Sequence, residues 1–318
     1  MKTVSEQNRD ARRVFMQGNP NLPEVSVVML NWNGWKETVK GLEALFESDY
    51  PNFNLVLLDN GSTDDSLDSL FRWFNERGHQ LVHSSGSTVD GKQCSLFAES
   101  DRIKILRSAT NVGFTGGNNR AITYALEKYS PKYVFLLNND AILEPNCLQN
   151  CVRLAEEHDA TIVGALIKST DRTAVIFSGA DPYREVFAAQ TPRRLESLPE
   201  YWETGRVEAS AELVSSDFLR QRIETYGYVL DPGFFIYCEE TDLALSALSQ
   251  GKKIMMTKHA VAYHGVAQSM GGWGNPMQYY YITRNRVFLA QRWLPVVKKV
   301  LFNIYYPVSR SMRIIQHV

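Results

Sequence analysis

The chain lacks the cysteine patterns that mark several common classes of protein. Its four cysteines, Cys94, Cys147, Cys151 and Cys238, form no CxxC pair and show no zinc spacing, so neither a disulfide framework nor a zinc finger is indicated. Cys147 and Cys151 lie four residues apart on an expected helix. They are better explained as small buried residues than as metal ligands. Reduced thiols of this kind are typical of a cytoplasmic protein.

An excess of charge of either sign is also absent. Among 318 residues, 34 Lys and Arg stand against 35 Asp and Glu, so no basic field favours nucleic acid as a partner. An anionic ligand must then be held by local groups or by a metal ion. With 44% apolar residues, the chain can still bury a large core, in one large or two ordinary domains.

Two kinds of long hydrophobic segment are missing as well. Residues 1–23 form a polar N-terminal extension without the apolar run of a secretory signal, so we expect a cytoplasmic protein. Residues 294–318 are rich in aliphatic and aromatic side chains, but a proline and two lysines interrupt them before the ~20 apolar residues of a spanning helix. This amphipathic segment either contacts the inner face of the plasma membrane or packs on the protein or a second subunit, as in a homodimer. Its basic residues are Lys298, Lys299, Arg310 and Arg313.

The sequence does contain apolar runs that end in polar clusters. The runs at 25–30, 55–58 and 133–137 lead into Asn31-Trp-Asn-Gly34, Asp59-Asn-Gly-Ser-Thr-Asp64 and Asn138-Asn-Asp140. Continuous apolar runs are typical of buried parallel strands, and open α/β sheets bind ligands at the carboxyl ends of their strands. We therefore expect a ligand crevice at one edge of a parallel sheet.

Strand-like and helix-like patterns alternate, which predicts an α/β fold with a Rossmann-like, mostly parallel central sheet flanked by helices. The first half predicts strands near 25–30, 54–58, 103–107, 133–137 and 161–165, and helices near 35–48, 64–77, 115–129 and 145–158. The stretch 78–102 has little periodicity and predicts a long surface loop. The second half extends the same sheet, with short β-like pieces at 173–179, 207–214, 252–257 and 261–264 and helices near 216–226 and 240–250.

The polar clusters after the first strands each have two interpretations. Asp59 could accept hydrogen bonds from a nucleotide, or could stabilise a turn. The loop Asn111-Val-Gly-Phe-Thr-Gly-Gly-Asn-Asn119 allows close approach to a ligand at its glycines, yet it matches neither GxGxxG nor GxxxxGK[ST]. Asp140 could hold a divalent metal on a diphosphate, or could be a turn residue.

A second group of polar residues lies farther along the chain. Glu239, Glu240 and Asp242 follow an aromatic segment at the first turn of an expected helix. There they either stabilise the helix through its dipole, or one of them is a base that deprotonates a substrate hydroxyl. His264 ends a β-like run and could be a ligand of metal or phosphate, although a lone histidine is usually neither. The residues alone leave these alternatives open.

Taken in order, these motifs resemble the family 2 glycosyltransferases of GT-A fold, and among them the rhamnosyltransferase-like branch. The resemblance covers residues 24–293 and implies a nucleotide-sugar half at 24–140, an acceptor half at 141–293 and a C-terminal helical extension. It rests on an ordered series of six motifs: Asn31-Trp-Asn-Gly34, Asp59-Asn-Gly-Ser-Thr-Asp64, Asn111-Val-Gly-Phe-Thr-Gly-Gly-Asn-Asn119, Leu136-Leu-Asn-Asn-Asp140, Phe234-Phe-Ile-Tyr-Cys-Glu-Glu-Thr-Asp-Leu243 and His264-Gly265.

The resemblance implies an inverting, metal-dependent transferase of hexosyl type. Its donor would be a UDP- or dTDP-linked sugar, with dTDP-rhamnose as a candidate, and its acceptor a hydroxyl of a glycan or lipid-linked glycan in cell-surface polysaccharide biosynthesis. In such enzymes the acid at Asp59 reads the pyrimidine base, and Asp140, here with His264, binds Mg²⁺ or Mn²⁺ on the diphosphate. The donor-binding residues implied are Asn31, Asn33, Asp59, Asn60, Gly113, Phe114, Gly117, Asn118 and Asn139.

The chain departs from the family pattern in three places. Asn138 replaces the first acid of the DxD-type motif, which leaves Asp140 as the main metal ligand. Glu240 occupies the position of the aspartate that serves the family as general base, so its carboxylate lies one methylene farther out, and Asp242 is the fallback base. Residues 214–217 occupy the place where relatives carry a small Gly-Ala pair facing the sugar.

Two other classes of function stay open on the sequence. A nucleotidyltransferase should carry a glycine-rich loop with Arg or Lys after the first strand, and residues 31–34 provide none. A non-catalytic sugar-nucleotide or glycan-binding relative would explain the altered motifs. Donor hydrolysis that depends on Glu240 and Asp140 separates the enzyme from the binding protein.

Overall fold

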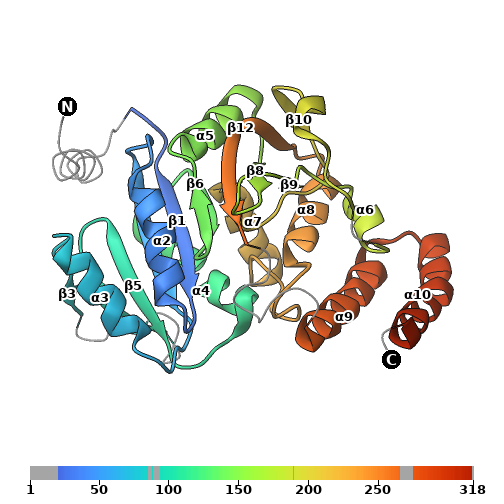
Figure 1. Ribbon diagram of the computed structural model, residues 1–318, viewed down its shortest axis with the longest axis horizontal. Coiled ribbons are helices and arrows are strands. Elements are labelled where there is room, and N and C mark those ends of the chain that lie inside the picture. Colours follow the sequence, from blue (N-terminus) through green and yellow to red (C-terminus); the bar gives the residue numbers. More distant parts are fainter. Residues whose placement is uncertain (1–20, 85–87, 89–93, 189, 266–274, 317–318) are drawn as a thin grey trace.

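The computed structural model describes residues 21–84, 88, 94–188, 190–265 and 275–316, so most of the expected N-terminal extension lies outside the described residues. Strands of this part of the chain join in one sheet at the centre of the molecule (Figure 1). In sequence order they are β1 (Val25–Asn31), β2 (Phe53–Asp59), β3 (Val82–His83), β4 (Cys94–Glu99), β5 (Ile103–Ser108), β6 (Tyr133–Asn138), β7 (Ala141–Leu143), β8 (Ile162–Lys168), β9 (Val175–Phe177), β10 (Tyr201–Glu203), β11 (Ala211–Ser215) and β12 (Ile254–His264).

The strand order is β10-β12-β8-β11-β6-β1-β2-β5-β4-β3, with β7 beside β12 and β9 beside β8. Parallel pairing of β1 with β2 and β6 sets Asn31 opposite Asp59 and Leu30 opposite Asn138. The carboxyl ends of these strands therefore meet at one edge, as expected. In contrast, β11 runs antiparallel between β6 and β8, so it begins at the edge where they end.

Helices flank the sheet, as the sequence predicts. They are α2 (Trp35–Phe46), α3 (Ser66–Glu76), α4 (Gly113–Tyr129), α5 (Cys147–His158), α6 (Pro182–Glu185), α7 (Ser216–Tyr226), α8 (Glu239–Ser249), α9 (Pro276–Trp293) and α10 (Val296–Gln316), with a 3₁₀ turn at Leu195–Ser197. The helix α4 packs on β1 and β2, and α5 packs on β8 and β12. The main core is formed by the apolar side chains between these helices and the sheet.

The prediction of a surface loop over residues 78–102 is wrong in part. This stretch contains β3 and β4, and β4 extends the sheet by pairing antiparallel with β5. Its side chains alternate, with Cys94, Leu96 and Ala98 buried, so the period of a half-buried strand was present beside a Ser- and Gly-rich stretch. The two β-like pieces at 252–257 and 261–264 are one strand, β12, with an irregularity in its pairing between Thr257 and Val261.

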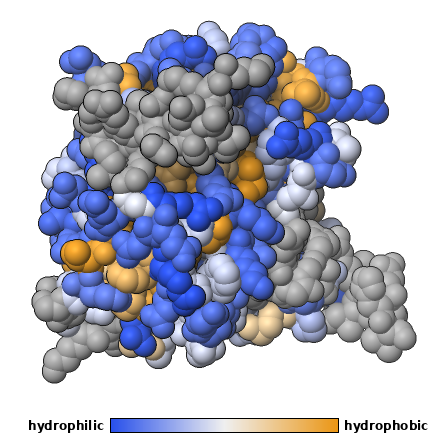
Figure 2. All heavy atoms as spheres, turned by 60° about the vertical axis from the view of Figure 1, so that its left-hand side comes forward, coloured by the Kyte–Doolittle hydropathy of each residue, from blue (hydrophilic) through white to orange (hydrophobic). Residues whose placement is uncertain are grey.

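A second, smaller apolar cluster joins α6, α8, α9 and α10. The helices α9 and α10 lie at the opposite end of the molecule from α3 (Figure 1). Phe302 and Tyr306 of α10 are buried in this cluster, whereas the other apolar side chains between Val296 and Val308 are exposed. Within the described residues, no helix is long and apolar enough to cross a membrane. The face of the molecule near α3 is mostly hydrophilic, with apolar side chains in small separate groups (Figure 2).

Candidate active site

A cleft of about 570 Å³ opens at the carboxyl ends of β1, β2 and β6. It is bounded by the loop after β1, the start of α4, the end of β6 and the segment before α8. The residues of the sequence prediction that line it are Asn31, Asn33, Asn60, Gly113, Phe114, Asn139 and Asp140. Trp32, Phe235 and Ile236 also line it, and they supply the apolar surface on which a flat ring can pack.

A hydrogen-bond network fixes the side of the cleft formed by the β1 and β2 ends. The buried Asn31 Nδ2 donates to Asp59 Oδ1 at 2.8 Å, and its Oδ1 accepts from Thr38 Oγ1 at 2.8 Å. Thr38 Oγ1 also accepts from Asn139 Nδ2 at 3.0 Å, which links the β1 loop to the end of β6. The two asparagines are therefore held in place before any ligand enters.

Three of the predicted donor-binding residues lie behind the cleft. Asp59 is buried, and its carboxylate accepts from Asn31, from Ser62 Oγ at 2.6 Å and from the Ser62 amide at 3.0 Å. Gly117 packs on β1, since a Cβ there would lie 2.9 Å from a methyl carbon of Leu30. Asn118 is buried and donates to the Phe114 carbonyl. These residues shape the wall of the cleft and do not line it.

Gly113 is required by both its backbone and its surroundings. Its φ is +76°, a conformation that residues with a side chain rarely adopt, and a Cβ would lie 2.5 Å from Cδ2 of Phe235. The glycine thus lets the start of α4 approach the segment before α8 across the cleft.

Next to Asp140, which lines the cleft, His264 lies between two carboxylates. Its Nε2 is 3.1 Å from Asp140 Oδ1, and its Nδ1 is 3.1 Å from Glu208 Oε1. Burial lowers the pKa of His264, but its hydrogen bonds and the charges of Asp140 and Glu208 outweigh that effect and raise the pKa to about 10. Asn138 Nδ2 approaches the same Nε2 at 3.4 Å.

These side chains can hold a divalent cation that also binds a diphosphate when the imidazole gives up the Nε2 proton that it shares with Asp140, because a histidine ligand must be neutral. Glu208 fixes the orientation of the imidazole through Nδ1 and leaves Nε2 directed toward Asp140, which is how second partners prepare a histidine ligand. In the described ranges of the chain, no three His, Cys, Asp or Glu side chains have the spacing of a complete metal site. The remaining ligands would therefore have to come from the diphosphate and from water.

Glu240 is held by a buried arginine. Arg206 Nη1 donates to Glu240 Oε1 at 2.9 Å, and the Nε and Nη2 of the same guanidinium form an ion pair with both oxygens of Glu185. The side chain of Arg206 is 7% exposed and that of Glu240 is 16% exposed. Burial raises the pKa of Glu240 above its usual value, and the charge of Arg206 opposes this effect.

Two further glutamates near this pair have buried carboxyl groups that are not fully hydrogen-bonded. Both oxygens of Glu212 and one oxygen of Glu239 lack a partner among the described residues. Burial, followed by the charge of Glu240, raises the pKa of Glu212 to about 8 and that of Glu239 well above its usual range. Burial thus favours the neutral form of both carboxyl groups.

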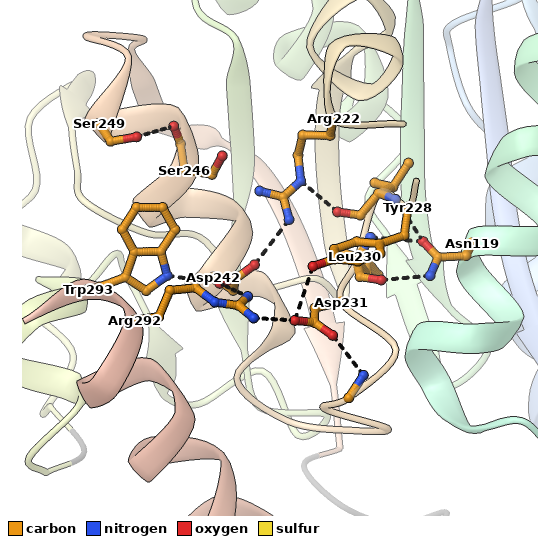
Figure 3. A network of polar contacts seen from close by, with 12 residues as sticks. Asn119, Arg222, Tyr228, Leu230, Asp231, Asp242, Ser246, Ser249, Arg292 and Trp293 are labelled. Atoms are coloured by element: carbon orange, nitrogen blue, oxygen red, sulfur yellow. Dashed lines mark hydrogen bonds and ion pairs between the residues drawn. The ribbon is translucent and has the colours of Figure 1, made fainter. Parts of the chain in front are cut away.

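Neither Glu240 nor Asp242 lines the cleft, and Asp242 is fully engaged in a buried network (Figure 3). Its Oδ2 accepts from Arg222 Nη2 at 3.0 Å, and its Oδ1 accepts from Arg292 Nη1 and Trp293 Nε1, each at 2.8 Å. Its side chain is 1% exposed. This geometry ties α7, α8 and α9 together and does not suit a base that must reach a substrate hydroxyl.

The expectation for residues 214–217 is wrong. Ser215, in the antiparallel strand β11, lies opposite Tyr133 at the start of β6, far from the cleft, while the Ser210 carbonyl accepts from the Asn138 amide at the edge where β6 ends. The segment that faces the site is therefore 206–211. Arg206 and Glu208 were not predicted as site residues. The one sequence feature that marks them is that both are charged and lie just before an apolar strand.

The chain belongs to glycosyl transferase family 2, whose model matches residues 26–208. It is 22% identical to the low-salt glycan biosynthesis hexosyltransferase Agl10 of Haloferax volcanii over 239 residues, which are 74% of each chain. It is also 24% identical over 140 residues to the glycosyltransferase GlyG of Streptococcus pneumoniae serotype 4, and this match spans 44% of the chain but only 37% of GlyG.

The fold is similar to those of solved glycosyltransferases. The mannosyltransferase PcManGT from Pyrobaculum calidifontis, in complex with GDP-Man and Mn²⁺, matches with a TM-score of 0.56 and 14% identity over 88% of this chain and 68% of that one. TarS 1–349 from S. aureus, in complex with UDP, matches with a TM-score of 0.54 and 15% identity over 87% and 68%. These likenesses confirm the predicted GT-A fold. The rhamnosyltransferase-like branch stays a prediction.

Proposed function

We propose that this protein is an inverting glycosyltransferase that moves a hexosyl group from a nucleoside diphosphate sugar to a hydroxyl of a glycan or lipid-linked glycan. One observation carries the proposal. One cleft at the carboxyl ends of the strands is lined by amide and aromatic groups and by Asp140, whose carboxylate is paired with His264. Family membership and a hexosyltransferase among the relatives support the same class of reaction.

The donor would lie along the cleft with its nucleoside on the β1 and β2 side. Asn31 and Asn33 offer polar groups there, and Trp32 offers a ring that is 42% exposed. Asp59 stays in the proposal as the residue that orients Asn31, because its oxygens are already occupied within the network. UDP and dTDP are the nucleotides we expect, with dTDP-rhamnose as the first sugar donor to try.

The diphosphate would reach Asp140 and His264, which would hold Mg²⁺ or Mn²⁺. When bound there, the cation supplies positive charge against the diphosphate as it leaves. The protein's own contribution is to keep the two ligands 3.1 Å apart, with Glu208 behind the imidazole. A neighbour in complex with GDP-Man and Mn²⁺ supports a divalent cofactor.

Glu240 is the base in this proposal. It would accept the proton of the acceptor hydroxyl, whose oxygen then attacks the anomeric carbon from the face opposite the diphosphate. A single displacement of this kind inverts the configuration. Arg206 fixes the carboxylate in one orientation, while burial raises its pKa toward the range where a base can take up a proton.

The first experiment is a thermal-shift titration with UDP, dTDP, GDP and CMP, each with Mn²⁺ and with EDTA. A ligand that binds only the folded state raises Tm. We expect a rise with UDP or dTDP that disappears in EDTA. If none of the four nucleotides raises Tm, the result would favour a non-catalytic relative that binds glycans.

Donor hydrolysis in the absence of acceptor tests the assigned roles. Asp140→Ala should abolish both the metal-dependent shift and hydrolysis, whereas Glu240→Gln should abolish hydrolysis and leave nucleotide binding intact. Glu224→Gln, at an exposed glutamate of α7, is the matched control for the second variant. Hydrolysis that survives Glu240→Gln would remove Glu240 from the role of base.

The helix α10 supports a place for the reaction at a membrane surface. Its exposed apolar side chains follow a spacing of three to four residues and form one face: Val296, Val297, Val300, Leu301, Ile304, Tyr305 and Val308. The helix carries lysine and arginine but no acid. Such a helix lies in the headgroup region of an anionic leaflet, and this position on the inner face of the plasma membrane would bring the cleft to a lipid-linked acceptor.

Cosedimentation with vesicles tests this placement. We expect binding to vesicles with anionic lipid, weaker binding to neutral vesicles, and loss of binding in Ile304→Asp. Asn303→Asp is the control, because it adds the same charge to α10 at a residue that accepts a hydrogen bond from Gln291 of α9. A stable dimer that Ile304→Asp disrupts, without vesicle binding by the original protein, would replace the membrane by a second copy of the chain.

A further inference from the structure

The short segment 233–238, here called the base loop, leads directly into α8 and Glu240. Three of its residues have backbone conformations that side chains disfavour: φ is +65° at Phe235, +69° at Tyr237 and +72° at Cys238. Non-glycine residues adopt such angles uncommonly, and the surrounding structure must hold them there. The base loop therefore needs an external restraint.

That restraint is the amide of Asn285 in α9. Asn285 is 0% exposed, and the two hydrogens of its Nδ2 are shared among three carbonyl oxygens of the base loop. The distances are 3.1 Å to Phe234, 2.8 Å to Ile236 and 2.7 Å to Tyr237. One side chain thus satisfies the backbone oxygens that the unusual dihedral angles turn toward α9.

The neighbouring Arg284 fixes how the amide is oriented. Its Nε donates to Asn285 Oδ1 at 2.9 Å, so the NH₂ group must point toward the loop. Its Nη2 donates to the carbonyls of Gly233 at 2.7 Å and Phe234 at 2.6 Å. The pair Arg284–Asn285 therefore engages four of the six carbonyl groups in the base loop.

The other side of the base loop faces the cleft. The Phe235 carbonyl accepts from the Thr115 amide of α4 at 3.1 Å, and Phe235 and Ile236 line the cleft. Farther along α9, Arg292 and Trp293 hold Asp242 of α8 (Figure 3). The helix α9 thus contacts α8 through Asp242 and contacts the base loop through Asn285 and Arg284.

We propose that Asn285 is a positioning residue for the glycosyl transfer and that it acts through the base loop on Glu240. Its kinetic consequence rests on the proposed function. Without the amide, the carbonyls of Ile236 and Tyr237 lose this donor and the loop can relax toward ordinary dihedral angles, which moves the start of α8. A displacement of the base by about 1 Å costs on the order of 100-fold in rate.

Thiol labelling of Cys238 tests the restraint without any substrate. Cys238 lies in the base loop with intermediate exposure, whereas Cys94, Cys147 and Cys151 are buried. We expect Asn285→Leu and Asn285→Asp to raise the labelling rate of Cys238 at least ~5-fold, and Cys238→Ser to remove the signal. Gln291→Ala, at an exposed residue of the same helix, should change nothing.

An unchanged labelling rate in folded Asn285→Leu would overturn the restraint. If both Asn285 variants fail to fold, Arg284→Lys is the milder variant, since it keeps the charge but loses the planar fork that reaches the carbonyls and the amide. It should give an intermediate rate, and a rate equal to that of the original protein would overturn the proposal in the same way.

Donor hydrolysis then separates positioning from simple stability. We expect kcat in Asn285→Leu to fall at least ~10-fold while KM for the donor changes less than ~3-fold. Leu70→Ala, which removes core packing in α3 at the opposite end of the molecule from α9, should lower stability and keep its kcat per folded molecule. Faster labelling with unchanged kcat would mean that the loop moves without moving the base. If the original protein hydrolyses no donor, the proposed function fails, and labelling still decides the restraint.

Discussion

Replacement of Asp242 by asparagine separates the structural acid of α8 from the proposed base. Asp242 accepts hydrogen bonds from Arg222, Arg292 and Trp293, all through atoms that are donors only. Asparagine has the same shape but carries no charge, and its NH₂ group would face one of these donors. The variant therefore leaves the guanidinium of Arg222, whose side chain is 2% exposed, without its counter-charge.

The expected loss of stability follows from this burial. Breaking a buried ion pair by removing one partner costs about 3–5 kcal/mol, because the other charge stays buried. Arg292 is 40% exposed and water compensates its charge, so Arg222 dominates the loss. Unfolding entropy of about 2.1 cal/mol/K per residue gives roughly 0.7 kcal/mol/K for a chain of this length, so Tm should fall by about 4–8 °C.

The assay is a melting curve together with donor hydrolysis per folded molecule at 25 °C. Asp242→Asn should lower Tm and retain hydrolysis, whereas Glu240→Gln should retain most of the stability and lose hydrolysis. Asp217→Asn is the control, since this side chain is 99% exposed and lies 3.9 Å from Arg220, and its Tm should not change. A fall in Tm below about 2 °C would refute the energetic argument. Loss of hydrolysis at unchanged Tm would make Asp242 the base.

Three further predictions concern residues around the cleft. Gly113→Ala should lower Tm by more than Gly227→Ala. Both glycines have a positive φ, +76° and +78°, but only at Gly113 would a Cβ meet another residue within 4 Å. If melting curves show equal losses of Tm, the backbone strain at positive φ explains both losses and the contact at Gly113 adds nothing. Glu212 has a folded-state pKa of about 8 against 4.5 in the unfolded chain, so its stabilising contribution is complete below pH 4.5 and is lost as pH rises through 8. Glu212→Gln should therefore raise Tm at pH 8 and have little effect at pH 5, and melting curves with the same pH slope as the original protein would contradict this. Arg206→Lys should lower kcat for donor hydrolysis about tenfold, because an ammonium lacks the fork that holds Glu240 and a second carboxylate together; an unchanged kcat would remove Arg206 from the positioning of the base.

The sequence pattern was sufficient for the central strands and for the side of the cleft that they form. Continuous apolar runs marked β1, β2 and β6, and the polar residues at their ends met because parallel strands share an edge. Asn31, Asn60 and Asp140 follow directly from this rule. The strand β4 was missed although its alternation was visible, because the serine and glycine content of its surroundings outweighed six residues of weak pattern.

The roles of the acids in α8 could not be read from their order. Glu240 and Asp242 are two residues apart, and both fit a first turn and a family motif. Arg206 reaches one and Arg222 reaches the other, from 34 and 20 residues away. Desolvation and charge partners decide which carboxylate can act as a base, and both depend on what packs against α8.

The sequence thus determined the class of fold and the residues at the ends of the parallel strands, because apolar periodicity is a local property and parallel strands end at one shared edge. The order of its motifs, by resemblance, indicated the family. Tertiary packing decided which of those residues face the cleft, where the antiparallel β11 enters the sheet, and how Asn285 holds a loop that lies about 50 residues earlier. Such contacts form between segments that share no local pattern, so their partners are fixed only when the chain closes around its core.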